Sequence, residues 1–97
     1  MASNKEYLQY VLELLRESSD ITYKKMMGEY ILYKNDIIIG GIYDNRFLVK
    51  KTKSLDSSGF REEIPYPGAK KMLLVDSEDP NEIKELIDKI YSDLAKK

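Results

Sequence analysis

The chain has no cysteine, no histidine and no tryptophan among its 97 residues. Without cysteine there are no disulfides, and an intracellular protein is the default expectation. Zinc, copper and haem sites ordinarily use Cys or His, so we predict no metal and no cofactor. Serine and cysteine catalysis assisted by histidine are excluded, and the usual general base at neutral pH is missing. We therefore predict no catalytic residues and a protein that is not an enzyme.

Long apolar runs and a secretory signal are also missing. No run approaches the ~20 apolar residues that a bilayer span requires. The N-terminus, MASNKEYLQY, lacks a basic region followed by an apolar one. We expect no membrane contact and a cytoplasmic location. With 42% apolar and 34% charged residues, the chain is expected to fold as one domain over residues 1–97.

Residues 30–50, YILYKNDIIIGGIYDNRFLVK, contain the clearest structural pattern. They predict three short strands joined by two-residue turns at Asn35-Asp36 and Asp44-Asn45. Asparagine and aspartate suit such turns because they tolerate the backbone conformations that the turns require. The pattern therefore predicts an antiparallel β-meander.

Further elements are predicted before and after the meander. Residues 4–17 carry an apolar stripe at helical spacing, and Ser3 with Glu6 fits a capping box. A second helix is predicted from Pro80, with Asp79 as its N-cap. Gly28 predicts either a turn or a bulge. Additional strands are predicted at 21–27, 62–66 and 72–75, and a loop at 51–61. The fold class is α+β: a two-layer structure in which an antiparallel β-meander sheet is flanked by an N-terminal and a C-terminal helix.

Alternation along the meander assigns its side chains to two faces. In this prediction Leu32 pairs with Ile39, and Gly41 pairs with Leu48. One face is apolar throughout and is expected to meet the first helix; it holds Ile31, Tyr33, Ile38, Gly40, Ile42, Phe47 and Val49. The opposite face is mixed; its apolar residues are Leu32, Ile37, Ile39 and Leu48, rimmed by Lys34, Arg46 and Lys50.

The mixed face supports the main hypothesis about function. If neither helix covers it, it forms an exposed apolar patch, which usually marks a protein contact, and a twofold dimer is the commonest arrangement. We predict a small non-enzymatic interaction module that binds a partner protein or a second copy of itself. The open alternative is that the second helix covers this face. The predicted contact residues are Tyr30, Leu32, Ile39, Tyr43, Arg46 and Leu48.

A second hypothesis is association with nucleic acid. Residues 21–53 carry seven positive and three negative charges, and tyrosines interleaved with lysines on a sheet can bind single strands. The overall pI of about 5.5 argues against this function, because nucleic-acid modules are usually strongly basic. The residues in question are Lys24, Lys25, Arg46, Lys50, Lys51, Lys70 and Lys71.

An enzyme is the third class considered, and it would have to use lysine, tyrosine or carboxylates alone. Glu62 and Glu63 are adjacent on a predicted strand, so they point to opposite faces and cannot easily share a proton. A pocket that gathers Glu62, Tyr66 and Lys70, with a raised carboxylate pKa, would favour this class.

Several segments together resemble one known family. They are NKEYLQYVLELL at 4–15, TYKKMMGEYILY at 22–33, GGIYDNRFLVK at 40–50 and YPGAKKMLLV at 66–75. In this order they resemble the N-terminal domain of the TfoX (Sxy) competence regulators, over nearly the whole chain. The resemblance implies a two-layer α+β fold and a bacterial intracellular regulator, and it implies no catalytic residue. Longer regulators of that family add a C-terminal helical domain, whereas this chain ends at Lys97. The expectation is therefore a stand-alone version of the N-terminal domain.

Overall fold

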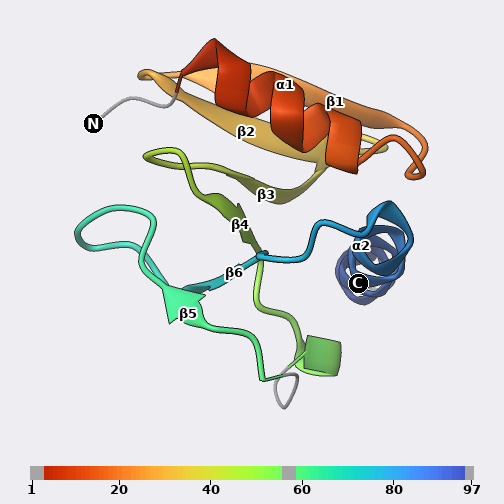
Figure 1. The fold of residues 1–97 in the computed structure, drawn as a ribbon. Helices are drawn as coiled ribbons and strands as arrows, with labels where there is room; N and C mark the ends of the chain where they lie inside the picture. The colour runs from red at the N-terminus through yellow and green to blue at the C-terminus, as the bar shows by residue number, and fades with distance from the viewer. Residues whose placement is uncertain (1–3, 56–58, 96–97) are drawn as a thin grey trace.

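A computed structural model of the chain describes residues 4–55 and 59–95. These residues form two α-helices, six strands and one turn of 3-10 helix (Figure 1). In chain order the elements are α1 (Lys5–Leu14), β1 (Ile21–Met26), β2 (Glu29–Lys34), β3 (Ile37–Ile42), β4 (Phe47–Val49), the 3-10 turn η1 (Lys53–Leu55), β5 (Glu62–Glu63), β6 (Met72–Leu74) and α2 (Pro80–Ala95). The predicted α+β class is confirmed.

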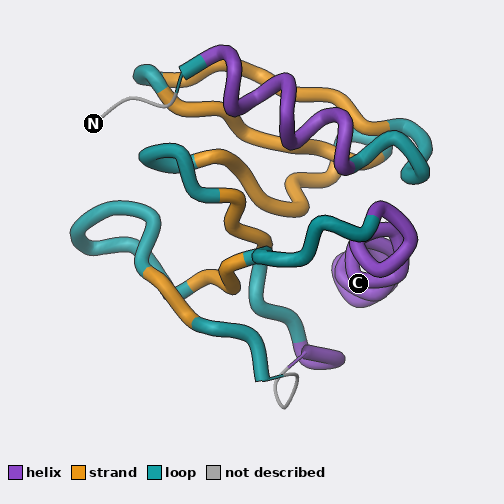
Figure 2. Tube along the Cα trace, in the orientation of Figure 1, coloured by secondary structure: helices purple, strands orange, loops and turns teal. Residues whose placement is uncertain are grey.

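The strands form one antiparallel sheet in the order β1-β2-β3-β4-β6-β5. Figure 2 shows it as a strongly twisted ribbon of strands that runs from β1 and β2, beside α1, to β5 and β6 at the far end. The first four strands follow one another as the predicted meander. β1 therefore forms one edge of the sheet and the short β5 forms the other.

Three two-residue turns connect the first four strands. Asn35-Asp36 and Asp44-Asn45 both have positive φ at each residue, as type I′ hairpin turns require. The same conformation occurs at Met27-Gly28, where φ is 52° and 85°. Both predicted turns are confirmed, and Gly28 belongs to a turn rather than a bulge.

The register between β2 and β3 differs from the prediction. Lys34 and Tyr33 pair as expected with the first residues of β3, but Leu32 pairs with Gly40 instead of Ile39. Ile39 is an extra residue on β3, a β-bulge. Because each residue along a strand changes face, the bulge shifts the alternation by one position for the rest of β3.

This shift makes the predicted assignment of faces wrong for part of the sheet. Ile31, Tyr33 and Ile38 do not lie on the same face as Ile42 and Phe47. The face that meets the helices instead carries Tyr30, Leu32, Ile39, Ile42, Phe47, Val49 and Leu73, all at most 5% exposed. Gly40 lies on this face as well, but the close approach is to β4 rather than to a helix. A Cβ placed at Gly40 would lie 2.8 Å from Val49 Cα.

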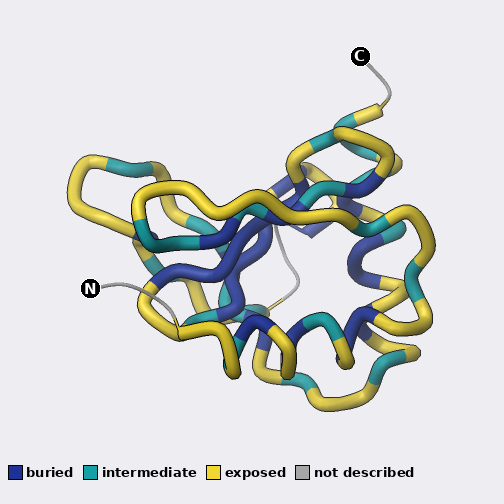
Figure 3. Tube along the Cα trace, turned by 90° about the horizontal axis from the view of Figure 1, so that it is seen from above, coloured by how far each residue is buried: buried dark blue, intermediate teal, exposed yellow. Residues whose placement is uncertain are grey.

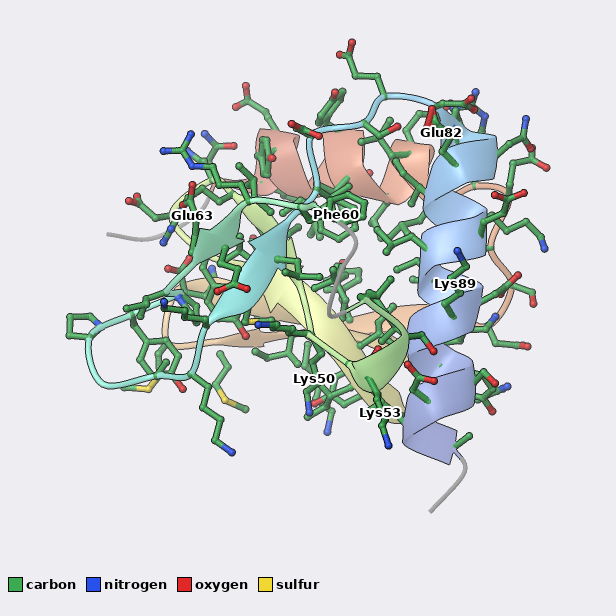
Figure 4. The ribbon with its side chains drawn as sticks, turned by 90° about the horizontal axis from the view of Figure 1, so that it is seen from below. Lys50, Lys53, Phe60, Glu63, Glu82 and Lys89 are labelled. Atoms are coloured by element: carbon green, nitrogen blue, oxygen red, sulfur yellow. The ribbon has the colours of Figure 1, made fainter. Side chains whose placement is uncertain are left out.

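Both helices pack against this one face. Leu8 and Val11 of α1 share a single buried cluster with Ile83 and Ile87 of α2 and with the sheet residues just named. Figure 3 shows the buried segments between the helices and the central strands, while β1 is exposed from Thr22 to Met26. In Figure 4 α1 runs across the top of the view, α2 runs down its right side, and Phe60 lies near them. Among the described residues no helix packs on the opposite face. The alternative in which the second helix covers the predicted mixed face is therefore right for Leu32 and Ile39, which lie beneath the helices, and wrong in placing the two helices on opposite faces.

Local sequence chemistry explains where the helices begin. Asn4 caps α1, because its side chain accepts a hydrogen bond of 2.7 Å from the Tyr7 amide. The cap predicted at Ser3 lies outside the described residues, and α1 ends at Leu14, earlier than predicted. At α2 the prediction is confirmed: Pro80 is the first helical residue, and the Asp79 side chain accepts from the Asn81 amide at 2.9 Å.

Candidate interaction surface

The six predicted contact residues do not form an exposed surface. Tyr30, Leu32 and Ile39 belong to the main core, beneath the helices. Tyr43 and Leu48 are also buried, at 9% and 0% exposure, although they lie outside that core cluster. The predicted assignment of these residues to one uncovered face is wrong, because the bulge at Ile39 shifts the alternation and both helices pack on the face that carries Tyr30, Leu32 and Ile39.

Arg46, the sixth residue, is held by groups of its own chain. Its Nη1 lies 2.6 Å from Glu63 Oε1, its Nε donates to the Tyr43 carbonyl, and its Nη2 donates to the Pro65 carbonyl at 3.3 Å. These bonds tie the β3–β4 turn to the loop between β5 and β6. Figure 1 shows these two segments beside each other at the left. Arg46 therefore positions a loop in this structure.

Strand register defines what lies on the face of the sheet opposite the helices. We call this surface the helix-free face; it consists of Thr22, Lys24, Met26, Glu29, Ile31, Tyr33, Ile38, Gly41 and Leu48. These residues come from the first four strands. Contact across strands agrees with this assignment, since Lys24 Nζ lies 6.0 Å from the centre of the Tyr33 ring.

One end of the helix-free face is closed by aromatic side chains. The Tyr43 ring lies over Gly41, because a Cβ at that glycine would be 2.7 Å from Tyr43 Cε2. The Tyr66 ring packs beside it, with centroids 6.2 Å apart. Burial raises the pKa of Tyr43 above its usual value, and the neighbouring Tyr66 adds to this effect. Leu48, paired with Gly41, is fully buried here.

The part of the helix-free face formed by β1, β2 and the start of β3 is open. We call it the open patch; it consists of Lys24, Met26, Ile31, Tyr33 and Ile38. Met26 is 52% exposed and Ile38 is 39% exposed, whereas Ile31 and Tyr33 are half-buried. Apolar side chains from three adjacent strands therefore remain in contact with water on this part of the face.

The open patch adjoins the turn at the tip of the first hairpin. Met27 occupies the first position of that turn, with φ of 52° and a side chain that is 96% exposed. Asparagine, aspartate or glycine are the usual residues there. An apolar side chain in a left-handed conformation, with no packing to hold it, is an outlier that favours a role in contact with another molecule.

The seven basic residues of the second hypothesis do not share one surface. Lys24 and Lys25 are adjacent on β1 and so point to opposite faces. Lys51 pairs with Glu62 at 2.7 Å, Lys71 lies 3.9 Å from the same carboxylate, and Arg46 is held by Glu63 as described. Lys50 and Lys70 are exposed. Figure 4 shows Lys50 near Lys53, while Glu63 lies away from both.

The enzyme hypothesis requires a carboxylate with a raised pKa, but the pKa of Glu62 is shifted in the opposite direction. The hydrogen bond from Lys51 holds the pKa of Glu62 below its usual value, so the group favours its charged form. A cavity of about 440 Å³ beside Tyr66 is lined by Glu29, Asp44, Arg46, Ile64, Pro65, Tyr66 and Pro67. Within residues 4–55 and 59–95, no three carboxylates lie close enough together to hold a metal ion.

No helix in the described part of the chain has both the length and the apolar character needed to cross a membrane.

The molecule is thus a two-layer α+β protein whose sheet carries both helices on one face and an open apolar patch on the other. No family model matches the chain. A protein of Spirochaeta aurantia, described as an uncharacterized 12.7 kDa protein in the trpE 5′ region, is 33% identical over 78 residues. The match covers 78% of this chain and 68% of that protein. The chain belongs to the family of this spirochaete protein, and its resemblance to the TfoX (Sxy) regulators stays a prediction.

Proposed function

We propose that this protein is a small, non-enzymatic regulatory module of the bacterial cytoplasm that acts by binding another protein. The open patch is the proposed contact surface, in place of the buried residues predicted from the sequence. The observation that supports it is the packing of both helices on one face, which leaves Met26 and Ile38 exposed on the other. Exposed apolar residues gathered from adjacent strands and accompanied by a charged residue are typical of protein contacts.

The resemblance to the TfoX N-terminal domain supports the regulatory part of the proposal. That resemblance implies an intracellular bacterial regulator, and the segment TYKKMMGEYILY, which carries part of it, includes most of the open patch. Nucleic-acid binding receives no comparable support, since three of the seven basic residues are paired with Glu62 or Glu63. A second copy of the chain is the alternative occupant of the patch.

Photo-crosslinking in the native bacterium tests this proposal. A photoreactive phenylalanine analogue replaces Tyr33 in the open patch, and in a matched control it replaces Tyr10, which is 43% exposed on α1. We expect crosslinks to a distinct protein from position 33 and none from position 10. Ile38→Thr, which keeps a β-branched residue in the strand, should lower the yield several-fold.

Two outcomes would contradict the proposal. Crosslinks from position 10 with none from position 33 would place the contact on the helical side. A product at twice the mass of the 11.3 kDa chain would show self-association instead of a partner. Absence of any crosslink at position 33, in cells where the chain is abundant and folded, would remove the open patch as a binding surface.

A further inference from the structure

β1 is an edge strand with an unusual amount of free backbone. It is six residues long, whereas the opposite edge strand, β5, has only two residues. Among the described residues no strand pairs with the outer side of β1. A long edge strand is a ready site for adding another strand, and proteins normally protect such edges.

The hydrogen-bond pattern shows which groups of β1 are free. The Asn35 amide donates to the Asp20 carbonyl at 3.1 Å. In an antiparallel pair the residues point their backbone groups alternately toward the partner strand and away from it. The backbone N–H and C=O groups of Ile21, Tyr23 and Lys25 therefore point away from β2, toward the open edge.

Two lysines decide what kind of strand this edge accepts. Lys24 and Lys25 are both exposed, and neither forms an ion pair with any residue of 4–55 or 59–95. They lie on opposite faces of the sheet. Lysines on an edge strand disfavour the addition of a neutral or basic strand, because the added strand would partly bury the lysine charges without neutralising them. A strand with acidic residues on both faces would instead be attracted.

We propose that β1 binds an extended acidic segment of the partner protein, which adds to the sheet as a seventh strand. This inference rests on the proposed function and specifies how the partner is held. Backbone hydrogen bonds to Ile21, Tyr23 and Lys25 supply the affinity, and two consecutive acidic residues of the segment pair with Lys24 and Lys25. Two are required because neighbouring residues of the incoming strand also point to opposite faces.

A second copy of the chain does not fit this edge as well. Two β1 strands would bring four lysines together, and like charges across a strand pair are destabilising. The chain's own acidic edge, Glu62-Glu63 of β5, is already paired with Lys51 and Arg46. The charge on β1 is therefore complementary to a foreign acidic strand.

A designed peptide tests the inference directly. The probe is a capped peptide of alternating valine and threonine with two consecutive glutamates at its centre, added to the full chain and followed by NMR and amide hydrogen exchange. We expect exchange at Ile21, Tyr23 and Lys25 to slow at least tenfold, with little change at Lys24, whose amide already bonds to β2. Binding should weaken several-fold in high salt, because exposed charges are screened.

Matched variants separate strand addition from general attraction. The double variant Lys24→Glu with Lys25→Glu should weaken binding at least tenfold. Lys70→Glu with Lys71→Glu changes the net charge equally at exposed positions outside β1, and it should change binding less than twofold. Tyr23→Pro removes an outward N–H without breaking a bond to β2, and it should also abolish binding if the variant folds.

Three results would overturn the inference: equal binding by a peptide with glutamine in place of glutamate, no exchange protection at the three edge residues, or equal losses in both double variants. Crosslinks from position 33 that persist in the Lys24→Glu, Lys25→Glu variant would preserve the proposed function and remove only the strand addition. If position 33 gives no crosslinks in the protein that keeps Lys24 and Lys25, the proposed function itself is wrong. The peptide result would then show only that β1 can accept an acidic strand.

Discussion

Replacing Met27 by asparagine should stabilise the protein. Met27 has φ of 52° at the first position of a type I′ turn, a conformation that costs an ordinary L-residue about 1 kcal/mol or more. Asparagine tolerates this conformation and is a preferred residue of such turns. Because the Met27 side chain is 96% exposed, its removal sacrifices little packing. We expect a net gain of about 0.5–1 kcal/mol in the free energy of unfolding.

Urea denaturation measures this gain. For a domain of this size the gain corresponds to a rise of roughly 2–8 °C in Tm, and to a higher urea midpoint with an unchanged m value. The reciprocal variant Asp44→Met places methionine at the equivalent position of the third turn, where φ is 53°, and should lose a similar amount. A loss of stability in Met27→Asn, or no cost in Asp44→Met, would refute the assignment of strain to the turn. A stabilised Met27→Asn variant that also crosslinks less would connect the strain to binding.

Three further perturbations test other parts of the fold. Gly40→Ala should destabilise by about 1–3 kcal/mol in urea denaturation, because its Cβ would meet the backbone of β4 at Val49 Cα. Lys34 is buried at 7% exposure and donates to the Ser19 carbonyl at 2.8 Å. In urea denaturation Lys34→Ala should lower the free energy of unfolding by about 2 kcal/mol. Lys34→Met should lower it by less than about 1 kcal/mol, because methionine keeps most of the aliphatic side chain. The Glu62 pKa is lowered by Lys51, so the stability from this pair is present above the unfolded pKa of about 4.3 and is lost as pH falls through the lower folded value. Urea midpoints measured from neutral to acid pH should show this loss in the native protein and a smaller one in Lys51→Met.

The elements predicted correctly are those that depend on local chemistry. The turns at Asn35-Asp36 and Asp44-Asn45 follow from residues that accept positive φ, and no distant contact is needed to specify them. The start of α2 follows in the same way from Asp79 and Pro80, which supply the cap and the first helical residue. Such signals are readable from a single sequence because the residues concerned are neighbours along the chain.

The faces of the sheet could not be read in this way. Three consecutive isoleucines, Ile37 to Ile39, contain no alternation, and the two glycines that follow have no side chain to assign to a face. Gly40 lies opposite Val49, as the predicted pairing of Gly41 with Leu48 implies, and a Cβ at Gly40 would meet the backbone of β4. The bulge lies instead between β2 and β3, and three identical side chains in a row do not indicate which residue is the extra one. A run of isoleucines followed by two glycines is nevertheless a signal that regular alternation should not be assumed.

The open patch was missed for the same reason, yet part of its signal is local. Met26-Met27-Gly28 places two apolar residues beside a glycine in a hairpin turn, where polar residues are the rule. Once the turn is assigned, Met27 is expected to be exposed, and an exposed apolar residue in a turn is a candidate contact residue. The exposure of Ile38 could be derived only after the bulge was known.

The open patch, the free edge and the hairpin tip meet at Met26. It is the last residue of β1, its side chain lies on the helix-free face, and Met27 follows it in the turn. A strand added to β1 would lie about 4.8 Å away and would extend the helix-free face, so one partner segment could contact the edge and the patch together. The two contributions should separate in kinetics. Lys24→Glu with Lys25→Glu should mainly slow association and reduce its salt dependence, whereas Ile38→Thr should mainly speed dissociation. Surface plasmon resonance with the crosslinked partner would measure both rates. If the charge variant changed only dissociation, and at all salt concentrations alike, the lysines would be acting as packing groups and the electrostatic role assigned to the edge would be wrong.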